Sequence, residues 1–188
     1  MNRRPSSILL PLDRPVVLVG LMGVGKTTVG RRLARRLGLP FVDSDAEIED
    51  AAGLPAGEVF TRYGEDSFRD GERRLVARLM EGPVRVIATG GGAFVNSETR
   101  LLLNERAITV WLNASVDLLT ERTARRPSTR PMLQNGDRAT ILEELAGKRG
   151  PSYAEAHIHV TSGSGSHAEV VETIVAALRS HLETPPCP

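Results

Sequence analysis

The sequence predicts an α/β protein in which a central, mainly parallel sheet of five strands lies between layers of helices. Three observations predict this class. Short apolar, β-branched segments alternate with amphipathic ones, Gly and Pro residues separate them, and no linker or internal repeat divides the 188 residues. With 40% hydrophobic residues, this length is sufficient for one domain with a substantial core.

The expected strands and helices follow one another along the chain. Strands are expected at residues 15–20, 40–45, 84–90, 107–112 and 157–161. Helices are expected at residues 26–38, in several pieces within 45–80 that break at 53–55 and 64, and at 96–106, 115–126, 138–148 and 167–182. In the first helix Val29, Leu33 and Leu37 fall on one stripe, and Gly38 then ends it.

Composition excludes several classes of protein. The net charge of +1 gives no electrostatic reason to expect nucleic acid or membrane as a partner. No apolar run approaches 18 residues, so no transmembrane span is expected. The single Cys187 excludes a disulfide framework and suits a reducing cytoplasm. The basic residues are nearly all Arg, which suits anionic ligands but fits a GC-rich genome equally well.

The chain is expected to form a single domain over residues 15–183. Residues 1–14 are expected to be a disordered or loosely docked extension, and residues 184–188 a tail. The apolar run ILLPL near the start is too short for the core of a signal peptide. We therefore expect a cytoplasmic protein, and we expect it to be a monomer.

A phosphate-binding loop is the strongest local signal. Residues 20–27 read GLMGVGKT, the pattern G-x-x-x-x-G-K-[ST], between a buried strand and an amphipathic helix. Backbone N–H groups of such a loop surround a phosphate, Lys26 reaches the β- and γ-phosphates, and the Thr27 hydroxyl is expected to ligate Mg²⁺. The residues expected to bind nucleotide here are Gly23, Val24, Gly25, Lys26, Thr27 and Thr28.

Two carboxylates follow in the stretch FVDSD. Asp43 and Asp45 flank one residue, so on an extended strand both side chains would point the same way, toward the crevice where open α/β sheets bind ligands. Two like charges so close are costly unless a cation or a hydroxyl donor uses them. The alternative is that they are solvated acids that cap the next helix.

Three consecutive glycines follow the third strand. In VRVIATGGGAF, Gly90, Gly91 and Gly92 leave the backbone almost unconstrained, which costs conformational entropy. An isolated cluster of this kind usually marks a flexible turn. The alternative is a site where a ligand lies directly against bare backbone.

Taken together, the motifs resemble the shikimate kinase family, a member of the nucleoside-monophosphate-kinase-like group of P-loop folds. The matching stretches span about residues 15–182 in the family's order. They are GLMGVGKTTVGRRLARRLG, FVDSDAEIE, FTRYGEDSFRDGE, ATGGGAF, RPML and KRGPSYAEAHIHV. The resemblance implies transfer of the ATP γ-phosphate to the 3-hydroxyl of shikimate, in the biosynthesis of chorismate and aromatic amino acids. It also implies a small acceptor-binding subdomain, about residues 44–72, and a lid, about residues 123–137.

The resemblance also assigns the acceptor site. Gly90, Gly91 and Gly92 approach the shikimate ring with bare backbone, where a Cβ would occupy the ligand's place. Asp45 hydrogen-bonds ring hydroxyls and orients, or deprotonates, the attacking one, while Asp43 holds Mg²⁺, through water. The carboxylate is gripped by Arg69 and Arg149, with Glu72 one helical turn after Arg69 to orient it. Without the resemblance, Arg69 reads as a solvated surface residue and Arg149 as a cap of its helix.

The resemblance places two further arginines around the nucleotide. Arg130, in the lid, closes over the phosphates and neutralises charge in the transition state, and Arg122 lies near adenine. The chain departs from the family in a lid about one residue longer and in the loop SGSGS, where relatives often carry basic or polar side chains. Adenine recognition is therefore expected to rest on backbone and on Arg122.

Three other functions are compatible with parts of the sequence. A gluconate kinase would share the architecture, but the triple glycine and FRDGE favour shikimate. A non-catalytic nucleotide-binding module is disfavoured by the intact Lys26, Thr27, Asp43 and Arg130. A GTPase switch is disfavoured because the chain has no N-K-x-D segment to read guanine.

Overall fold

The computed structural model of the chain describes residues 9–125, 136–163 and 165–183. Five parallel strands form one sheet in the order β2-β3-β1-β4-β5. The strands are β1 (Val16–Val19), β2 (Phe41–Asp43), β3 (Val86–Ala88), β4 (Ile108–Asn113) and β5 (Ile158–Thr161). The predicted sheet is confirmed, and β1 lies at its centre.

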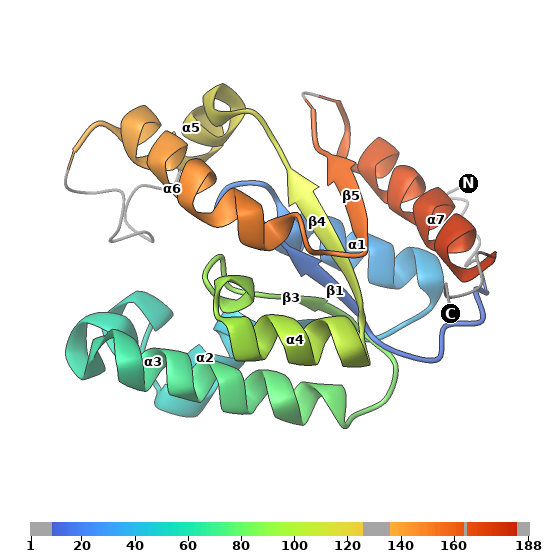
Figure 1. The fold of residues 1–188 in the computed structure, drawn as a ribbon, viewed down its shortest axis with the longest axis horizontal. Coiled ribbons are helices and arrows are strands. Elements are labelled where there is room, and N and C mark those ends of the chain that lie inside the picture. The colour runs from blue at the N-terminus through green and yellow to red at the C-terminus, as the bar shows by residue number, and fades with distance from the viewer. Residues whose placement is uncertain (1–8, 126–135, 164, 184–188) are drawn as a thin grey trace, which may run out of the picture.

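Helices cover both faces of the sheet, as predicted for a three-layer fold. Figure 1 shows α4 and α6 on the near face and α1 and α7 on the far face, while α3 lies beside α4 with α2 packed against it. The bounds are α1 (Lys26–Leu37), α2 (Ser44–Ala52), α3 (Ala56–Met80), the 3₁₀ turn η1 (Ala93–Val95), α4 (Ser97–Arg106), α5 (Val116–Ala124), α6 (Arg138–Tyr153) and α7 (His167–Glu183).

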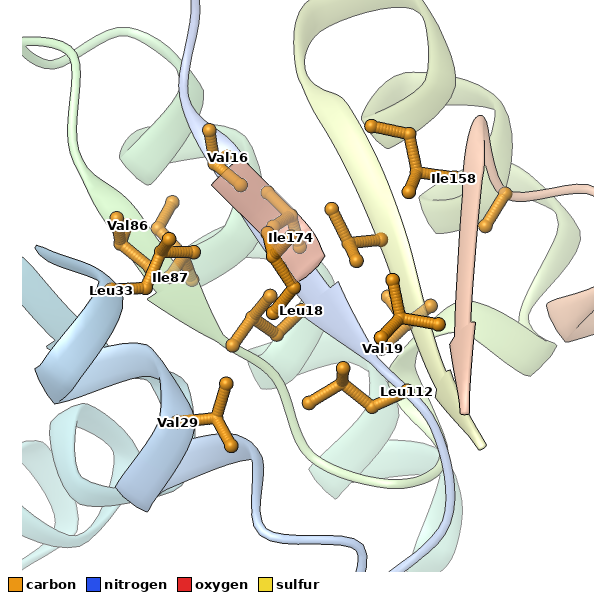
Figure 2. Close-up of a cluster of buried hydrophobic side chains, with 14 of the residues drawn as sticks. Val16, Leu18, Val19, Val29, Leu33, Val86, Ile87, Leu112, Ile158 and Ile174 are labelled. Carbon is orange, nitrogen blue, oxygen red and sulfur yellow. The ribbon is translucent and has the colours of Figure 1, made fainter. Parts of the chain in front are cut away.

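The core is built around β1. All four residues of this strand are buried, because helices cover both of its faces. Figure 2 shows side chains of α1, such as Leu33, and of α7, such as Ile174, meeting those of β1 and its neighbouring strands. At the sheet edge, β5 instead alternates buried and exposed residues. The central position of β1 fixes where the loop after it emerges.

Helix α1 has the boundaries and the buried face that the sequence predicts. It begins after Gly25, whose φ is 101°, and ends at Gly38 in the left-handed conformation, with the Gly38 N–H donated to carbonyls of the last turn. Val29, Leu33 and Leu37 are all buried. The predicted apolar stripe is therefore confirmed.

The second strand is shorter than predicted, which changes the relation between its two carboxylates. The strand ends at Asp43, and Asp45 lies in the first turn of α2. The expectation that both side chains project from one extended strand is wrong. Instead the Asp43 carboxylate caps α2, accepting a hydrogen bond from the Asp45 N–H at 3.1 Å. Because the chain turns into a helix here, the two carboxylates point in different directions.

Three further features of the helices either differ from the sequence-based expectation or add detail to it. Helix α6 continues to Tyr153 instead of ending at residue 148, and it contains Pro151. Gly150 and Pro151 are poor helix formers, yet the helix passes through them and its last residue, Tyr153, is buried. Within α3, Gly64 has non-helical angles (φ 82°, ψ 164°), so the break predicted there is confirmed. The short turn η1 was not predicted.

The described part of the N-terminal segment lies against the domain. Leu10 and Leu12 are partly buried and pack on the core. In the described ranges no helix combines the length and the apolar character needed to cross a membrane.

We expect that Leu33→Ala lowers the free energy of unfolding by about 2–5 kcal/mol, because it leaves a cavity under the central strands. Urea denaturation measures this change. Leu101→Ala is the matched control, since Leu101 is 62% exposed on α4, and it should change stability by about 0.5 kcal/mol or less. Equal losses in the two variants would contradict this account of the core.

Candidate active site

The functional segments meet at the carboxyl ends of the strands. The loop after β1 is the predicted phosphate loop, β2 ends on Asp43, and the glycines 90–92 follow β3. Because the strands are parallel and β1 lies between β3 and β4, these loops all emerge at the end of the sheet that the carboxyl ends of the strands form. This is the crevice in which open α/β sheets bind ligands.

The phosphate loop wraps tightly around the end of β1. Gly20 has a φ of 137°, and a Cβ there would collide with the Leu112 carbonyl of β4, so the loop can leave the strand only with a glycine at this position. The Lys26 ammonium donates to the carbonyls of Gly20 at 2.7 Å and Leu21 at 3.0 Å. The Lys26 side chain is therefore held across the opening of the phosphate loop, where it is predicted to reach the phosphates.

The other predicted nucleotide residues lie around the same loop. Val24 is buried, so its contribution must come from its backbone, whereas Thr27 and Thr28 are exposed on the first turn of α1. Gly25 immediately precedes the N-terminus of α1, where backbone N–H groups favour anions.

An oxygen pair beside the phosphate loop fits a magnesium ion. The Thr27 hydroxyl donates to Asp43 Oδ2 at 2.7 Å, so the two residues predicted to hold Mg²⁺ are in direct contact. Among the described residues no group of three or more His, Cys, Asp or Glu side chains could hold a metal. Mg²⁺ does not require one, because it is usually held by one or two protein oxygens together with substrate phosphates and waters.

A pocket of about 420 Å³ lies between the phosphate loop, α2, α3, the glycine segment and α6. It contains every residue predicted for acceptor binding. Its lining consists of Met22, Asp45, Ala56, Gly57, Phe60, Thr61, Phe68, Arg69, Glu72, Gly90, Gly91, Gly92 and Arg149. Two guanidinium groups and two carboxyl groups thus share one cavity with an apolar wall.

Functional side chains pack directly on the backbone of two of the three glycines, Gly90 and Gly92. A Cβ at Gly90 would lie 2.6 Å from Asp45 Oδ1 and 2.7 Å from Glu72 Oε1, and one at Gly92 would lie 2.6 Å from the central carbon of the Arg69 guanidinium. Any larger residue would displace these groups. This packing favours the interpretation of the segment as a wall of the site over that of a plain flexible turn.

The glycine segment is also held by hydrogen bonds. The buried Ser44 hydroxyl accepts from the Gly90 N–H at 3.1 Å. On the other side, the Gly91 carbonyl accepts from Arg149 Nη1 at 3.0 Å and from the Tyr153 hydroxyl. Helices α2 and α6 thus fix the segment from opposite sides.

Glu72 orients Arg69, as the sequence predicts for residues one helical turn apart. Arg69 Nη1 donates to Glu72 Oε2 at 2.7 Å. Glu72 is 2% exposed, and its other oxygen, Oε1, is buried with no partner among the described residues. Burial raises the pKa of Glu72 above its usual range, although Arg69 and Arg149 oppose that shift.

Asp45 is the second perturbed carboxyl group of the pocket. Burial and then the charge of Asp43 raise the pKa of Asp45 to about 6, while Lys26 opposes the shift. A carboxylate with this pKa is ionised at neutral pH and is a stronger base than an ordinary Asp. Perturbed carboxyl groups that line a cavity are typical of functional sites.

Arg122 joins the phosphate loop to the loop after β5. It donates to the Val24 carbonyl at 3.1 Å, to Ser162 Oγ at 3.3 Å and to the Gly163 carbonyl at 3.2 Å. Its place beside the phosphate loop is compatible with the predicted position near adenine. Arg130 and most of the predicted lid lie outside the described residues, so the lid stays a prediction.

Tyr153 and Ser44 were not identified from the sequence, although both contact the glycine segment. Tyr153 follows Arg149 by four residues, which places both on one face of a helix. That relation was hidden because α6 was expected to end at residue 148. Ser44 gave no signal beyond its place between two Asp residues.

The strand order and the phosphate loop after β1 define a P-loop kinase of the nucleoside-monophosphate-kinase-like class, an ATP-dependent phosphotransferase. The family model described as "Shikimate kinase" matches residues 22–179. This chain belongs to the shikimate kinase family.

Individual relatives support the assignment over most of the chain. The shikimate kinase of Caulobacter vibrioides is 55% identical, covering 93% of this chain and 87% of that protein. That of Zymomonas mobilis is 48% identical, covering 95% and 99%. The solved structure of shikimate kinase from Acinetobacter baumannii in complex with shikimate superposes with a TM-score of 0.86 at 37% identity, covering 91% of this chain and 96% of that one.

A gluconokinase from Sinorhizobium meliloti shares the fold only. Its structure superposes with a TM-score of 0.60 at 20% identity, covering 95% of this chain and 94% of that one. The architecture alone therefore does not distinguish the two acceptors.

The raised pKa of Asp45 generates a test of stability against pH. The folded protein holds this proton up to about pH 6, whereas the unfolded chain loses it near the ordinary pKa of 3.8. The charged carboxylate thus destabilises the fold increasingly as the pH rises from about 4 to above 6. We expect Asp45→Asn to stabilise the protein by roughly 1–3 kcal/mol at neutral pH and to have little effect below about pH 4.

Urea denaturation without nucleotide, acceptor or Mg²⁺, at neutral and at acidic pH, measures the effect. Asp50→Asn is the matched control, because Asp50 is exposed on the same helix, α2. This control removes an exposed negative charge, so it separates the effect of losing a charge from the effect of losing a buried charge. A stabilisation by Asp45→Asn that is equal at both pH values would contradict the assigned shift.

Proposed function

We propose that this protein transfers the γ-phosphate of ATP to the 3-hydroxyl of shikimate, giving shikimate 3-phosphate and ADP. The observation that carries the proposal is that the acceptor pocket and the phosphate loop share a wall. A Cβ at Gly91 would lie 3.5 Å from the Met22 nitrogen and 3.7 Å from the Gly20 carbonyl oxygen. An acceptor in the pocket would thus lie beside a nucleotide in the loop, as direct phosphoryl transfer requires.

The pocket suits a small hydroxylated carboxylic acid. Arg69 and Arg149 reach it from α3 and α6, and a guanidinium pair is suited to hold a carboxylate through paired hydrogen bonds. Asp45, from α2, supplies acceptors for hydroxyl groups. Phe60 and Phe68, whose rings meet edge to face at 5.6 Å, supply an apolar wall for a carbon ring.

The proposed mechanism relies on position and charge. Asp45 accepts the hydrogen bond of the attacking hydroxyl and orients it, and its raised pKa allows it to take the proton as the new bond forms. Lys26 neutralises charge on the transferred group. Glycines 23 and 25 and the start of α1 bind the phosphates through backbone N–H groups.

Thr27 and Asp43 would hold Mg²⁺ at the mouth of the phosphate loop, the latter through water. When bound, the ion would offset the negative charge of the phosphates. We also propose that Arg122 contacts adenine and that Arg130 closes over the phosphates.

ADP release with ATP and shikimate, with ATP and gluconate, and with ATP alone tests the function directly. We expect turnover with shikimate and little with the other two. Lys26→Met should fold normally yet lower turnover by about 100-fold or more, since it removes the charge aimed at the phosphates. Comparable rates with gluconate, or near-normal kinetics in Lys26→Met, would contradict the proposal.

A second test separates the two carboxylates. Asp43→Asn should bind Mg²⁺ less well and regain activity as Mg²⁺ is raised, while Asn preserves the cap of α2. Asp45→Ala removes acceptors for ring hydroxyls, so affinity for shikimate should fall by about 10- to 150-fold, with affinity for ATP unchanged and no rescue by Mg²⁺.

Titrations of both variants with ATP, shikimate and Mg²⁺ distinguish these outcomes. If the two variants respond identically to all three, the carboxylates act as a single negative site and the assigned roles are wrong.

A further inference from the structure

The Gly91 carbonyl lies at the end of two hydrogen-bond donors from α6. Arg149 Nη1 donates to it at 3.0 Å, and the Tyr153 hydroxyl donates to it as well. The donors are four residues apart, on one face of the helix. One backbone oxygen thus has two partners, although the reaction proposed above assigns a role only to Arg149.

The two donors differ in how firmly they are held. Arg149 is partly exposed and lines the pocket. Because its guanidinium carries five N–H donors, it can also donate to a ligand in the pocket. Tyr153 is 1% exposed, and its ring centre lies 6.0 Å from that of Trp111. Trp111 in turn packs against His159 at 5.2 Å and flanks Gly20, where the phosphate loop begins. Tyr153 is therefore the fixed donor of the two.

Fixing the Gly91 carbonyl fixes the next N–H group. In a planar trans peptide the Gly91 C=O and the Gly92 N–H point in opposite directions, so a donor on the carbonyl sets the direction of the N–H. Flanking glycines allow this peptide to rotate with little steric resistance. A hydrogen bond from a buried hydroxyl restricts that rotation beside the acceptor pocket.

We propose that Tyr153 is a positioning residue for the acceptor, which holds the Gly91–Gly92 peptide in its binding orientation while Arg149 turns to the acceptor's carboxylate. The inference rests on the proposed function. Burial raises the pKa of Tyr153 above its usual value of 10, although Arg149 opposes the shift. The hydroxyl consequently remains protonated, and able to donate, at neutral pH.

Tyr153→Phe tests the proposal, because it retains the ring and removes only the hydroxyl. We expect KM for shikimate to rise about five- to tenfold, as for the loss of one hydrogen bond, with KM for ATP changed by about twofold or less. Hydrogen exchange at residues 90–93 should accelerate.

Thr109→Val is the matched control. Thr109 is buried, its hydroxyl donates to Asn104 at 2.8 Å, and it lies outside the pocket. We expect it to lower the melting temperature without changing KM for shikimate. If Tyr153→Phe behaves in the same way, or raises both KM values equally, Tyr153 only stabilises the fold and the proposal is overturned.

The measurements separate this proposal from the proposed function. Failure of the wild-type protein to phosphorylate shikimate would overturn the function, whereas hydrogen exchange at residues 90–93 needs no substrate and still tests the hold on the peptide.

If Tyr153→Phe does not fold, fluorine NMR of the protein with Tyr153 intact replaces this variant. The chain has only two tyrosines, so 3-fluorotyrosine gives two signals, and Tyr63→Phe assigns them.

We expect the Tyr153 signal to shift on addition of shikimate and to change little with ATP alone. A signal that is insensitive to saturating shikimate would contradict the proposal.

Discussion

The close approach of two backbone segments is the constraint on which the rest of the site depends. The phosphate loop and the glycine segment each leave the end of a central strand, and Gly91 lies against Gly20 and Met22 with no side chain between them. Phosphoryl transfer requires donor and acceptor within bonding reach, and the close approach of these two segments places the acceptor pocket beside the phosphate loop. The glycines, the parallel sheet and the central place of β1 all serve this contact.

Burial of charge is the energetic consequence of that contact. Asp45 and Glu72 lie over Gly90, and burial raises the pKa of each carboxyl group. Glu72 Oε1, which has no hydrogen-bond partner in the described part of the chain, adds to this cost. A ligand that supplies hydrogen-bond donors to these oxygens would offset part of this cost on binding. The hydrophobic core formed by β1, α1 and α7 offsets the free energy that burial of these carboxyl groups costs.

Sequence reasoning predicted the sheet and the helices from hydrophobic period and the phosphate loop from a motif with a local physical cause, whereas Arg69 and Arg149 were assigned to the acceptor site only through the resemblance to the family. It failed where tertiary packing overrides a local signal. The helix expected over residues 138–148 continues through Gly150 and Pro151 to the buried Tyr153. The strand before Asp45 read as extended, yet the cap at Asp43 turns it into a helix. The contacts of Ser44 and Tyr153 join distant segments, which no local pattern encodes.

The break at Gly64 divides α3 into two rods with different tasks. Phe60 and Thr61 lie before it and give the pocket part of its shape, while Arg69 and Glu72 lie after it and give the pocket its charge. The two rods are nevertheless coupled, because the rings of Phe60 and Phe68 meet across the break at 5.6 Å and the Arg69 guanidinium lies 5.4 Å from the Phe68 ring. A change in the apolar wall on either side of Gly64 would therefore also reach the arginine, so the outline of the acceptor that such an enzyme admits and its grip on the acid group vary together.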